Sequence, residues 1–273
     1  MTDTTDAPTV EKLASGTPMG VVARIGLGAR AVIYLTMGLL AISVARGASR
    51  TSVDQRGAIR TILQQPLGTF LVVLLTIGFV AYALWRFSEV FFGPDGEKDT
   101  VATRAKSLVR GVAYGFFAVG AVAILLGDKE SQTKQQQDAA NTALHLPGGQ
   151  VVLGLVGAAF VLAGALMVWE GWTTKFLSYF DYLPPVRRRI VVWLGRTGTI
   201  ARGLVFALAG ALVVIAAWTA DADSAGGVND AVHVALRWPF GGGIVTVMGV
   251  GLLIFGAYGV TETLWRHVPE DNS

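Results

Sequence analysis

Six long apolar runs, separated by polar segments, dominate the hydropathy pattern of this chain. Each run reaches the ~20 residues that an α-helix needs to cross the ~30 Å hydrocarbon core of a bilayer. The pattern therefore predicts an all-α, polytopic integral membrane protein with six transmembrane helices. The predicted spans are 26–46, 66–90, 107–127, 149–172, 199–219 and 241–264.

The six runs are three copies of one two-helix unit. Each copy begins with two arginines six residues apart, runs apolar, breaks into a polar loop and restarts at a Pro-x-Gly motif. Because each copy contains an even number of spans, all three hairpins insert in the same sense around a pseudo-threefold axis. The restart motifs are Pro66 and Gly68, Pro147 and Gly149, and Pro239 and Gly241.

These repeats set the organisation of the chain. The first repeat covers 24–92, the second 104–172 and the third 196–267. A polar, Thr- and Pro-rich segment, 1–20, precedes them, and its composition predicts a disordered cytoplasmic tail. A basic linker, 173–195, separates the second and third repeats.

A second repeated element lies in the loop before each proline. Apolar residues spaced i, i+1, i+4, i+5 line one face of a helix, which predicts a short amphipathic helix on the outer surface of each hairpin. Asp138 and Asp230 are the expected N-caps, with Gly57 at that position in the first copy. Each proline is then expected in the first turn of the even span, where its missing N–H costs nothing. The apolar positions are Ala58, Ile59, Ile62 and Leu63; Ala139, Ala140, Ala143 and Leu144; and Ala231, Val232, Ala235 and Leu236.

The distribution of charge predicts the membrane topology. Only 15% of the residues are charged, against roughly 25% in a soluble domain. Of the 22 Lys and Arg residues, fifteen lie on the side where the odd spans begin and seven on the other. The positive-inside rule then predicts a protein of the cell membrane with both termini in the cytoplasm. This distribution argues against a nucleic-acid partner despite the pI of about 9.3.

The basic linker carries its own prediction. Arg187, Arg188 and Arg189 precede the apolar stretch 190–194 on the cytoplasmic side. A basic cluster beside an apolar-aromatic stretch favours contact with anionic lipid head groups. An ordinary positive-inside loop is the alternative.

An arginine near the start of each odd span recurs with a glutamate near the end of each even span. Each charge is unfavourable for the dipole of its own helix, but in an antiparallel arrangement it meets a neighbouring helix end of opposite sign. We therefore predict arginine–glutamate pairs, formed within a hairpin or to the next hairpin around a ring. Such pairs would serve as a structural clamp or as a gate or ion relay. The pairs are Arg30–Glu89, Arg110–Glu170 and Arg202–Glu262.

Small residues recur at aligned positions within the spans, where they allow helices to approach closely. Close packing is the favoured interpretation, and a glycine-lined substrate path is the alternative. The aligned sets are Gly38, Ala118 and Gly210, and Gly78, Ala159 and Gly251.

Motifs for catalysis or cofactor binding are not apparent. The absence of cysteine excludes disulfides, thiolate metal sites and a cysteine nucleophile. His145, His233 and His267 lack metal-ligand spacing, and no phosphate-binding loop or hydrolase motif occurs. We expect no enzymatic activity, no cofactor and no metal.

The tripled pattern resembles a known family. The Arg-x5-Arg start with an aromatic residue in the following turn, the Pro-x-Gly restart and the terminal glutamate are similar to the bacterial membrane family called domain of unknown function 1206. The resemblance implies six helices in three repeats and no established activity. The first copy departs from the pattern at Ala31, where the other two have glycine.

Two functions remain open from the sequence. A non-catalytic structural, assembly or partner-binding membrane protein is favoured, because polar side chains are scarce near mid-bilayer and no proline interrupts a span. The alternative is a channel or transporter for a small solute or ion, with its path between the three repeats. A polar cavity on the axis would support transport, and a packed axis would support assembly.

Overall fold

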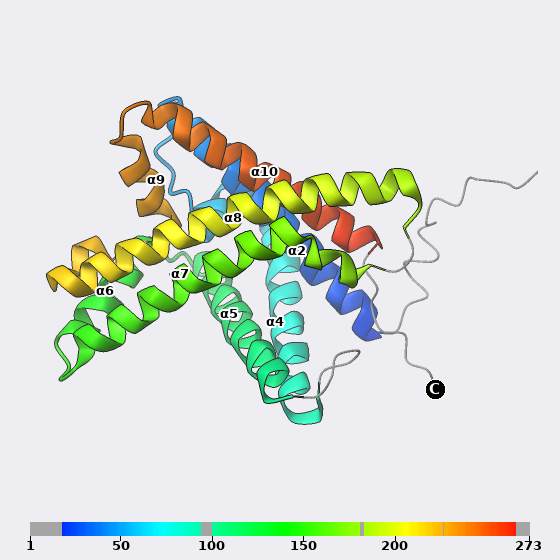
Figure 1. Ribbon diagram of the computed structural model, residues 1–273, viewed down its shortest axis with the longest axis horizontal. Helices are drawn as coiled ribbons and strands as arrows, with labels where there is room; N and C mark the ends of the chain where they lie inside the picture. The colour runs from blue at the N-terminus through cyan, green and yellow to red at the C-terminus, as the bar shows by residue number, and fades with distance from the viewer. Residues whose placement is uncertain (1–17, 94–99, 181–182, 226, 266–273) are drawn as a thin grey trace, which may run out of the picture.

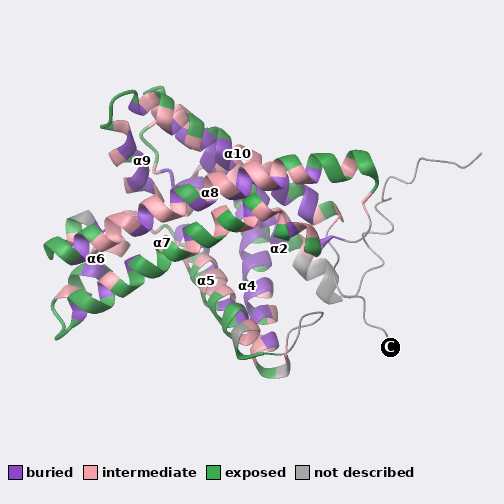
Figure 2. Cartoon of the chain, in the orientation of Figure 1, coloured by how far each residue is buried: buried purple, intermediate pink, exposed green. Residues whose placement is uncertain are grey.

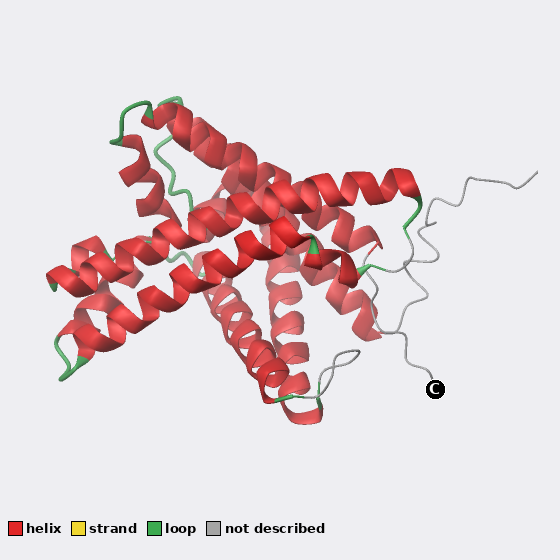
Figure 3. Cartoon of the chain, viewed as in Figure 1, coloured by secondary structure: helices red, strands yellow, loops and turns green. Residues whose placement is uncertain are grey.

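The computed structural model describes residues 18–93, 100–180, 183–225 and 227–265, and these contain helices but no strand (Figure 3). Six of the helices are long and apolar enough to cross a membrane, which confirms the predicted fold class. The predicted tail lies outside the described residues, apart from 18–20, which begin the first helix. The six helices are α2 (Pro18–Ala45), α4 (Gly68–Phe92), α5 (Val101–Leu125), α7 (Gly149–Thr173), α8 (Pro185–Thr219) and α10 (Gly241–Trp265).

The spans form three pairs, and each pair joins two different repeats (Figure 1). α4 packs against α5, α7 packs against α8, and α10 returns to pack against α2. Each even span thus lies against the odd span of the next repeat, and the last repeat closes on the first. By contrast, α5 and α7 belong to the same repeat but make little contact with each other.

Glycines seven residues apart bring α7 and α8 together. A Cβ atom on Gly164 would lie 2.6 Å from the carbonyl oxygen of Gly203, and one on Gly157 would lie 2.7 Å from the amide nitrogen of Val214. Seven residues are almost two helical turns, so both glycines lie on the face that contacts α8. The backbones therefore touch, as small residues in membrane helices permit.

The pair α10–α2 repeats this contact. A Cβ atom on Gly249 would lie 2.9 Å from the carbonyl oxygen of Gly38, and one on Gly256 would lie 2.7 Å from Leu35 Cγ. Gly38 and its aligned counterpart Gly210 thus serve the close packing that the sequence predicts. In contrast, Ala159 on α7 is exposed, because the helix it would face within its own repeat lies too far away.

Each Pro-x-Gly motif forms a tight turn at the start of an even span. The amide of Gly68 donates to the carbonyl of Gln65 at 2.8 Å, and Leu67 between proline and glycine has φ 63°. This is the backbone of a type II turn, with proline at its second position. A Cβ atom on Gly68 would lie 2.3 Å from the carbonyl oxygen of Ile62, so only glycine fits.

The other two motifs have the same geometry, with φ 75° at Gly148 and φ 61° at Phe240. The expectation that proline occupies the first helical turn is wrong. The even spans begin at the glycine, because the left-handed residue before it cannot belong to a right-handed helix.

The three short outer helices are present: α3 (Gln55–Leu63), α6 (Gln132–Leu144) and α9 (Val228–Leu236). Their predicted N-caps are wrong. The caps are Asp54, Ser131 and Gly227. Gly57, Asp138 and Asp230 therefore lie inside their helices, because each helix begins three or more residues ahead of its apolar face.

The basic linker is largely helical. A 3-10 helix, η1 (Lys175–Tyr179), leads into α8, which begins at Pro185 and runs unbroken to Thr219. Proline at the helix start supports this, and Val191 is fully buried in a cluster with Phe176 and Phe255. A second 3-10 helix, η2 (Ala222–Ser224), lies between α8 and α9.

Candidate functional site

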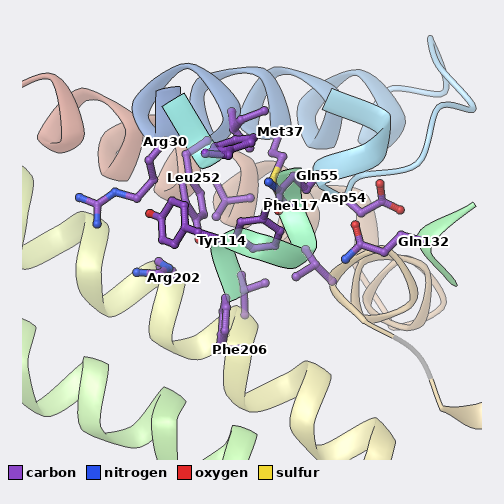
Figure 4. A pocket seen from close by; sticks show the side chains of 15 residues that line it. Arg30, Met37, Asp54, Gln55, Tyr114, Phe117, Gln132, Arg202, Phe206 and Leu252 are labelled. Carbon is purple, nitrogen blue, oxygen red and sulfur yellow. The ribbon is translucent and has the colours of Figure 1, made fainter. Parts of the chain in front are cut away.

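A cavity of about 100 Å³ lies where the three odd spans meet (Figure 4). Tyr34, Tyr114 and Phe206, which occupy the same position in the three repeats, all line it. Tyr34 lies close to the middle of the span 24–45, and Tyr114 lies at the middle of the span 103–125. The cavity is therefore axial and at mid-span depth, and we call it the axial cavity.

Arg30 and Arg202 lie at one end of the axial cavity, beside Tyr114 (Figure 4). Arg30 of α2 forms an ion pair with Glu262 of α10, whose side chain is only 3% exposed. This pair joins the third repeat to the first and closes the ring. Because Arg and Glu are paired in a low-dielectric setting, neither carries an uncompensated charge.

Arg202 of α8 is surrounded by aromatic rings instead. Its guanidinium carbon lies 5.2 Å from the ring centroid of Tyr34, 5.0 Å from that of Phe206 and 4.8 Å from that of Phe255. Its Nε atom is buried without a hydrogen-bond partner. Among the residues described, Arg202 forms no ion pair.

The opposite end of the axial cavity is polar as well. Asp54, Gln55 and Gln132 lie there, separated from the arginines by Met37 and Phe117 (Figure 4). Gln55 and Gln132 are the first residues of α3 and α6, so the outer helices begin at the cavity. This end is nearer to the outer surface than the arginine end.

Asp54 is a buried acidic group at the outer end. It is 2% exposed, its Oδ1 accepts a 2.7 Å hydrogen bond from the amide of Gly57, and its Oδ2 has no partner. Burial raises the pKa of Asp54 above its ordinary value, although Arg60 and Arg56 oppose the shift.

Hydrogen bonds join the outer helices, and the segments that precede them, across the repeats. Arg56 of α3 pairs with Asp128 of the second repeat at 2.8 Å. Asn229 of α9 accepts from the amide of Val53 at 3.0 Å and donates to Thr133 at 3.3 Å. These outer contacts follow the same cyclic order as the spans, and they cover the outer end of the axial cavity.

The ring arrangement determines which of the predicted charge pairs form. The pairs Arg30–Glu89 and Arg202–Glu262 within hairpins are wrong, because each even span packs on the next repeat. Arg30 pairs instead with Glu262, as the predicted alternative of a pair to the next hairpin around the ring has it. Glu89 instead accepts from Arg86 at 2.7 Å and from Ser107 of α5 at 2.5 Å.

The second-repeat pair, Arg110–Glu170, does not form either. Within the described part of the chain, neither side chain has an ion pair or a side-chain hydrogen bond. The reason is the separation of α5 from α7 noted above. Figure 2 shows the result on α7, which is exposed along most of its length.

The remaining predicted residues lie apart from the axial cavity. Pro66, Pro147 and Pro239 form the turns before the even spans, and Gly149 and Gly241 begin α7 and α10 as Gly68 begins α4. Arg187 lies over the ring of Trp265 at 5.5 Å, whereas Arg188 and Arg189 are exposed at the start of α8.

Sequence reasoning missed Arg86, Asp54 and Asn229. Arg86 has no counterpart in the other repeats, where Met167 and Gly259 take its position, so the repeat pattern drew attention away from it. Its spacing of three residues from Glu89 is the signal that could have found it. Asp54 precedes an amphipathic pattern, which is the usual place for an N-cap.

Comparisons with known proteins agree with this architecture. The model of the family described as Domain of Unknown Function (DUF1206) matches three times, at residues 25–93, 105–174 and 197–266. The chain is also 27% identical over 250 residues to the uncharacterized protein YxxB of Bacillus subtilis (strain 168), covering 90% of each chain. No solved structure matches.

Proposed function

Since the chain belongs to the DUF1206 family, whose function is unknown, we propose a function from the axial cavity: a path for a small solute or ion through the centre of the ring. The observation that carries the proposal is a cavity at mid-span depth, at the interface of all three repeats, with charged or polar side chains at both ends. Binding sites of transporters built from repeats lie in this place.

The test compares solute flux through the wild-type protein with flux through a variant whose axial cavity is filled. Ile33 lines the axial cavity and is 3% exposed, whereas its neighbour Val32 is 44% exposed on the outside of α2. In proteoliposomes, wild-type protein is expected to pass small ions or solutes, Ile33→Phe to pass at least tenfold less, and Val32→Phe to match wild type. Equal flux with Ile33→Phe and wild type, or none above empty liposomes, would rule out the axial path.

The second candidate function is assembly or partner binding, which the sequence favours. The glycine contacts of α7–α8 and α10–α2 support it, because backbones in contact leave little room for spans to move. Isolation of the tagged protein from its native membrane in a gentle detergent separates the two. A stoichiometric membrane partner supports assembly, and a solitary protein that passes solute supports transport.

We assign the protein no catalytic step. Its proposed location is the cell membrane, with both termini in the cytoplasm, because of the excess of Lys and Arg on that side. Neither a cofactor nor nucleic acid belongs to the proposal.

Anionic lipid is the partner proposed for the cytoplasmic face. At 1.5 Å per residue, the 35 residues of α8 measure about 52 Å, longer than the hydrocarbon core, so its first turns lie among the head groups. Ile190 and Trp193 are exposed there beside Arg188 and Arg189. Native mass spectrometry with phosphatidylglycerol is expected to show adducts that Arg188→Gln/Arg189→Gln loses.

A further inference from the structure

We infer that the inner end of the axial cavity holds one small inorganic anion, of the size of chloride or nitrate, against the guanidinium of Arg202. The inference rests on the proposed axial path and names the class of solute that the path takes. It follows from a count of charges, from the size of the cavity and from the groups around Arg202.

The inner end carries one positive charge in excess. Two arginines line it, and the ion pair with Glu262 neutralises Arg30. Among the described residues, Arg202 has aromatic ring faces around its guanidinium, no ion pair, and a buried Nε without a partner. Ring faces attract a cation but do not neutralise it. A charge left uncompensated within a membrane is costly, so a counter-anion is the missing component.

The outer end does not supply that counter-charge. Asp54 lies beyond Met37 and Phe117 from the arginines (Figure 4). It also belongs to a group that is neutral by itself. In this group, the two acids Asp54 and Asp128 balance the two bases of α3, of which Arg56 pairs with Asp128 and Arg60 donates to the backbone carbonyl of Asp128 at 3.2 Å.

The size of the cavity selects the ligand. A volume of about 100 Å³ has room for several water-sized groups, since one water needs at least ~10–15 Å³ of such space. Pockets for organic ligands usually measure about 300–1,000 Å³. A halide or a small oxyanion therefore fits, and a larger organic acid does not. The hydroxyl of Tyr114 lies on the same side as the two arginines and offers a further donor (Figure 4).

Anion-dependent stability tests the inference without requiring transport. Purified protein is heated in chloride, in nitrate or in gluconate, which is too large to enter, at constant ionic strength. A ligand that binds only the folded protein raises its melting temperature, and we expect a rise of about 3 °C in saturating chloride or nitrate over gluconate. No difference between the three salts in wild-type protein would overturn the inference.

Variants assign the effect to Arg202. Arg202→Gln is expected to abolish the chloride response. Arg110→Gln removes the aligned arginine of the second repeat, which does not line the cavity, and is expected to keep it. If Arg202→Gln fails to fold, Ile33→Phe takes its place, because it fills the cavity and must also lose the response. A response that persists in the variant tested overturns the inference.

The two proposals fail separately. An anion response in wild type without flux in proteoliposomes keeps the anion site and rejects the axial path. Flux of other solutes without an anion response keeps the path and rejects the anion site.

Discussion

The same position of the repeat holds an arginine three times, and each of these arginines has a different environment. Arg30 pairs with Glu262, Arg202 lies among aromatic rings, and Arg110 has neither kind of contact among the residues described. The sequence could predict the positions of these charges near the inner ends of the spans. It could not predict their partners, because those depend on how closely each repeat packs on the next.

The ion pair Arg30–Glu262 is expected to stabilise the closed ring. Reversing one charge alone, as Arg30→Glu or Glu262→Arg, leaves a buried charge without a partner and should lower the free energy of unfolding by about 3 kcal/mol or more. The double reversal should recover much of that loss. Denaturation in SDS, followed by circular dichroism, measures all four proteins.

The aligned residues of the second repeat provide the control. Arg110→Glu and Glu170→Arg are expected to have additive effects, because these two side chains do not touch. A double reversal at Arg30 and Glu262 that is no more stable than the worse single variant would contradict the pairing.

Asp54 makes the stability of the outer end depend on pH. Because burial raises its folded-state pKa above the unfolded value near 3.8, its favourable contribution is complete below pH 3.8 and is lost as pH rises through the folded pKa. At neutral pH the ionised carboxylate therefore opposes folding. Asp54→Asn keeps an N-cap side chain and should raise the melting temperature at pH 7, with a smaller gain near pH 4.

The matched variant is Asp54→Ala, which also loses the hydrogen bond from Gly57. It should fall below Asp54→Asn by about 1 kcal/mol at either pH. If Asp54→Asn were less stable than wild type at pH 7, the ionised Asp54 carboxylate would stabilise the fold, contrary to this prediction.

At the scale of the elements, sequence periodicity predicted the six spans and three outer helices well. Aligned glycines also indicated close packing. Periodicity could not predict which helices pair, because Gly164 and Gly203 indicate only that each helix has a face suited to close packing. Which helix fills that face is a property of the closed ring. The continuous helix through 185–219 was missed, since the basic residues 187–189 resemble a loop.

Close packing of α7 on α8 predicts opposite effects for two glycine substitutions. Gly164→Ala places a Cβ atom against backbone atoms of α8 and should lower the free energy of unfolding by about 1–2 kcal/mol, as overpacking does. Gly115→Ala meets nothing within 4 Å and should stabilise α5 by up to about 1 kcal/mol, as alanine does within a helix. A Gly164→Ala variant at least as stable as wild type would show that α7 and α8 are not in contact at Gly164.

At the scale of the whole molecule, the ring is closed between the repeats and open within the second repeat. The pairs α4–α5, α7–α8 and α10–α2 join the three repeats to one another, whereas α5 and α7 of the second repeat diverge. The sequence predicted three equivalent hairpins. The second repeat differs from the other two, because Ala159 of α7 is exposed and does not pack against α5.

The orientation of the ring can be tested because the chain has no cysteine of its own. Gln64 follows α3 and Ser178 belongs to η1, and both are exposed. In intact cells, a maleimide that cannot cross membranes should label Gln64→Cys and not Ser178→Cys, and permeabilised cells should label both. The reverse pattern would place both termini outside the cytoplasm.

The return of α10 to α2 has a consequence for how such a protein can be built. The most extensive helix contacts join different repeats, so a polypeptide of a single repeat would hold both surfaces of such a contact and be unable to join them to each other. Three such polypeptides could join them between subunits, as a cyclic homotrimer. Gene duplication and fusion would then turn the three subunit interfaces into the interior of one chain, and a circular permutant starting at any repeat would preserve all of them.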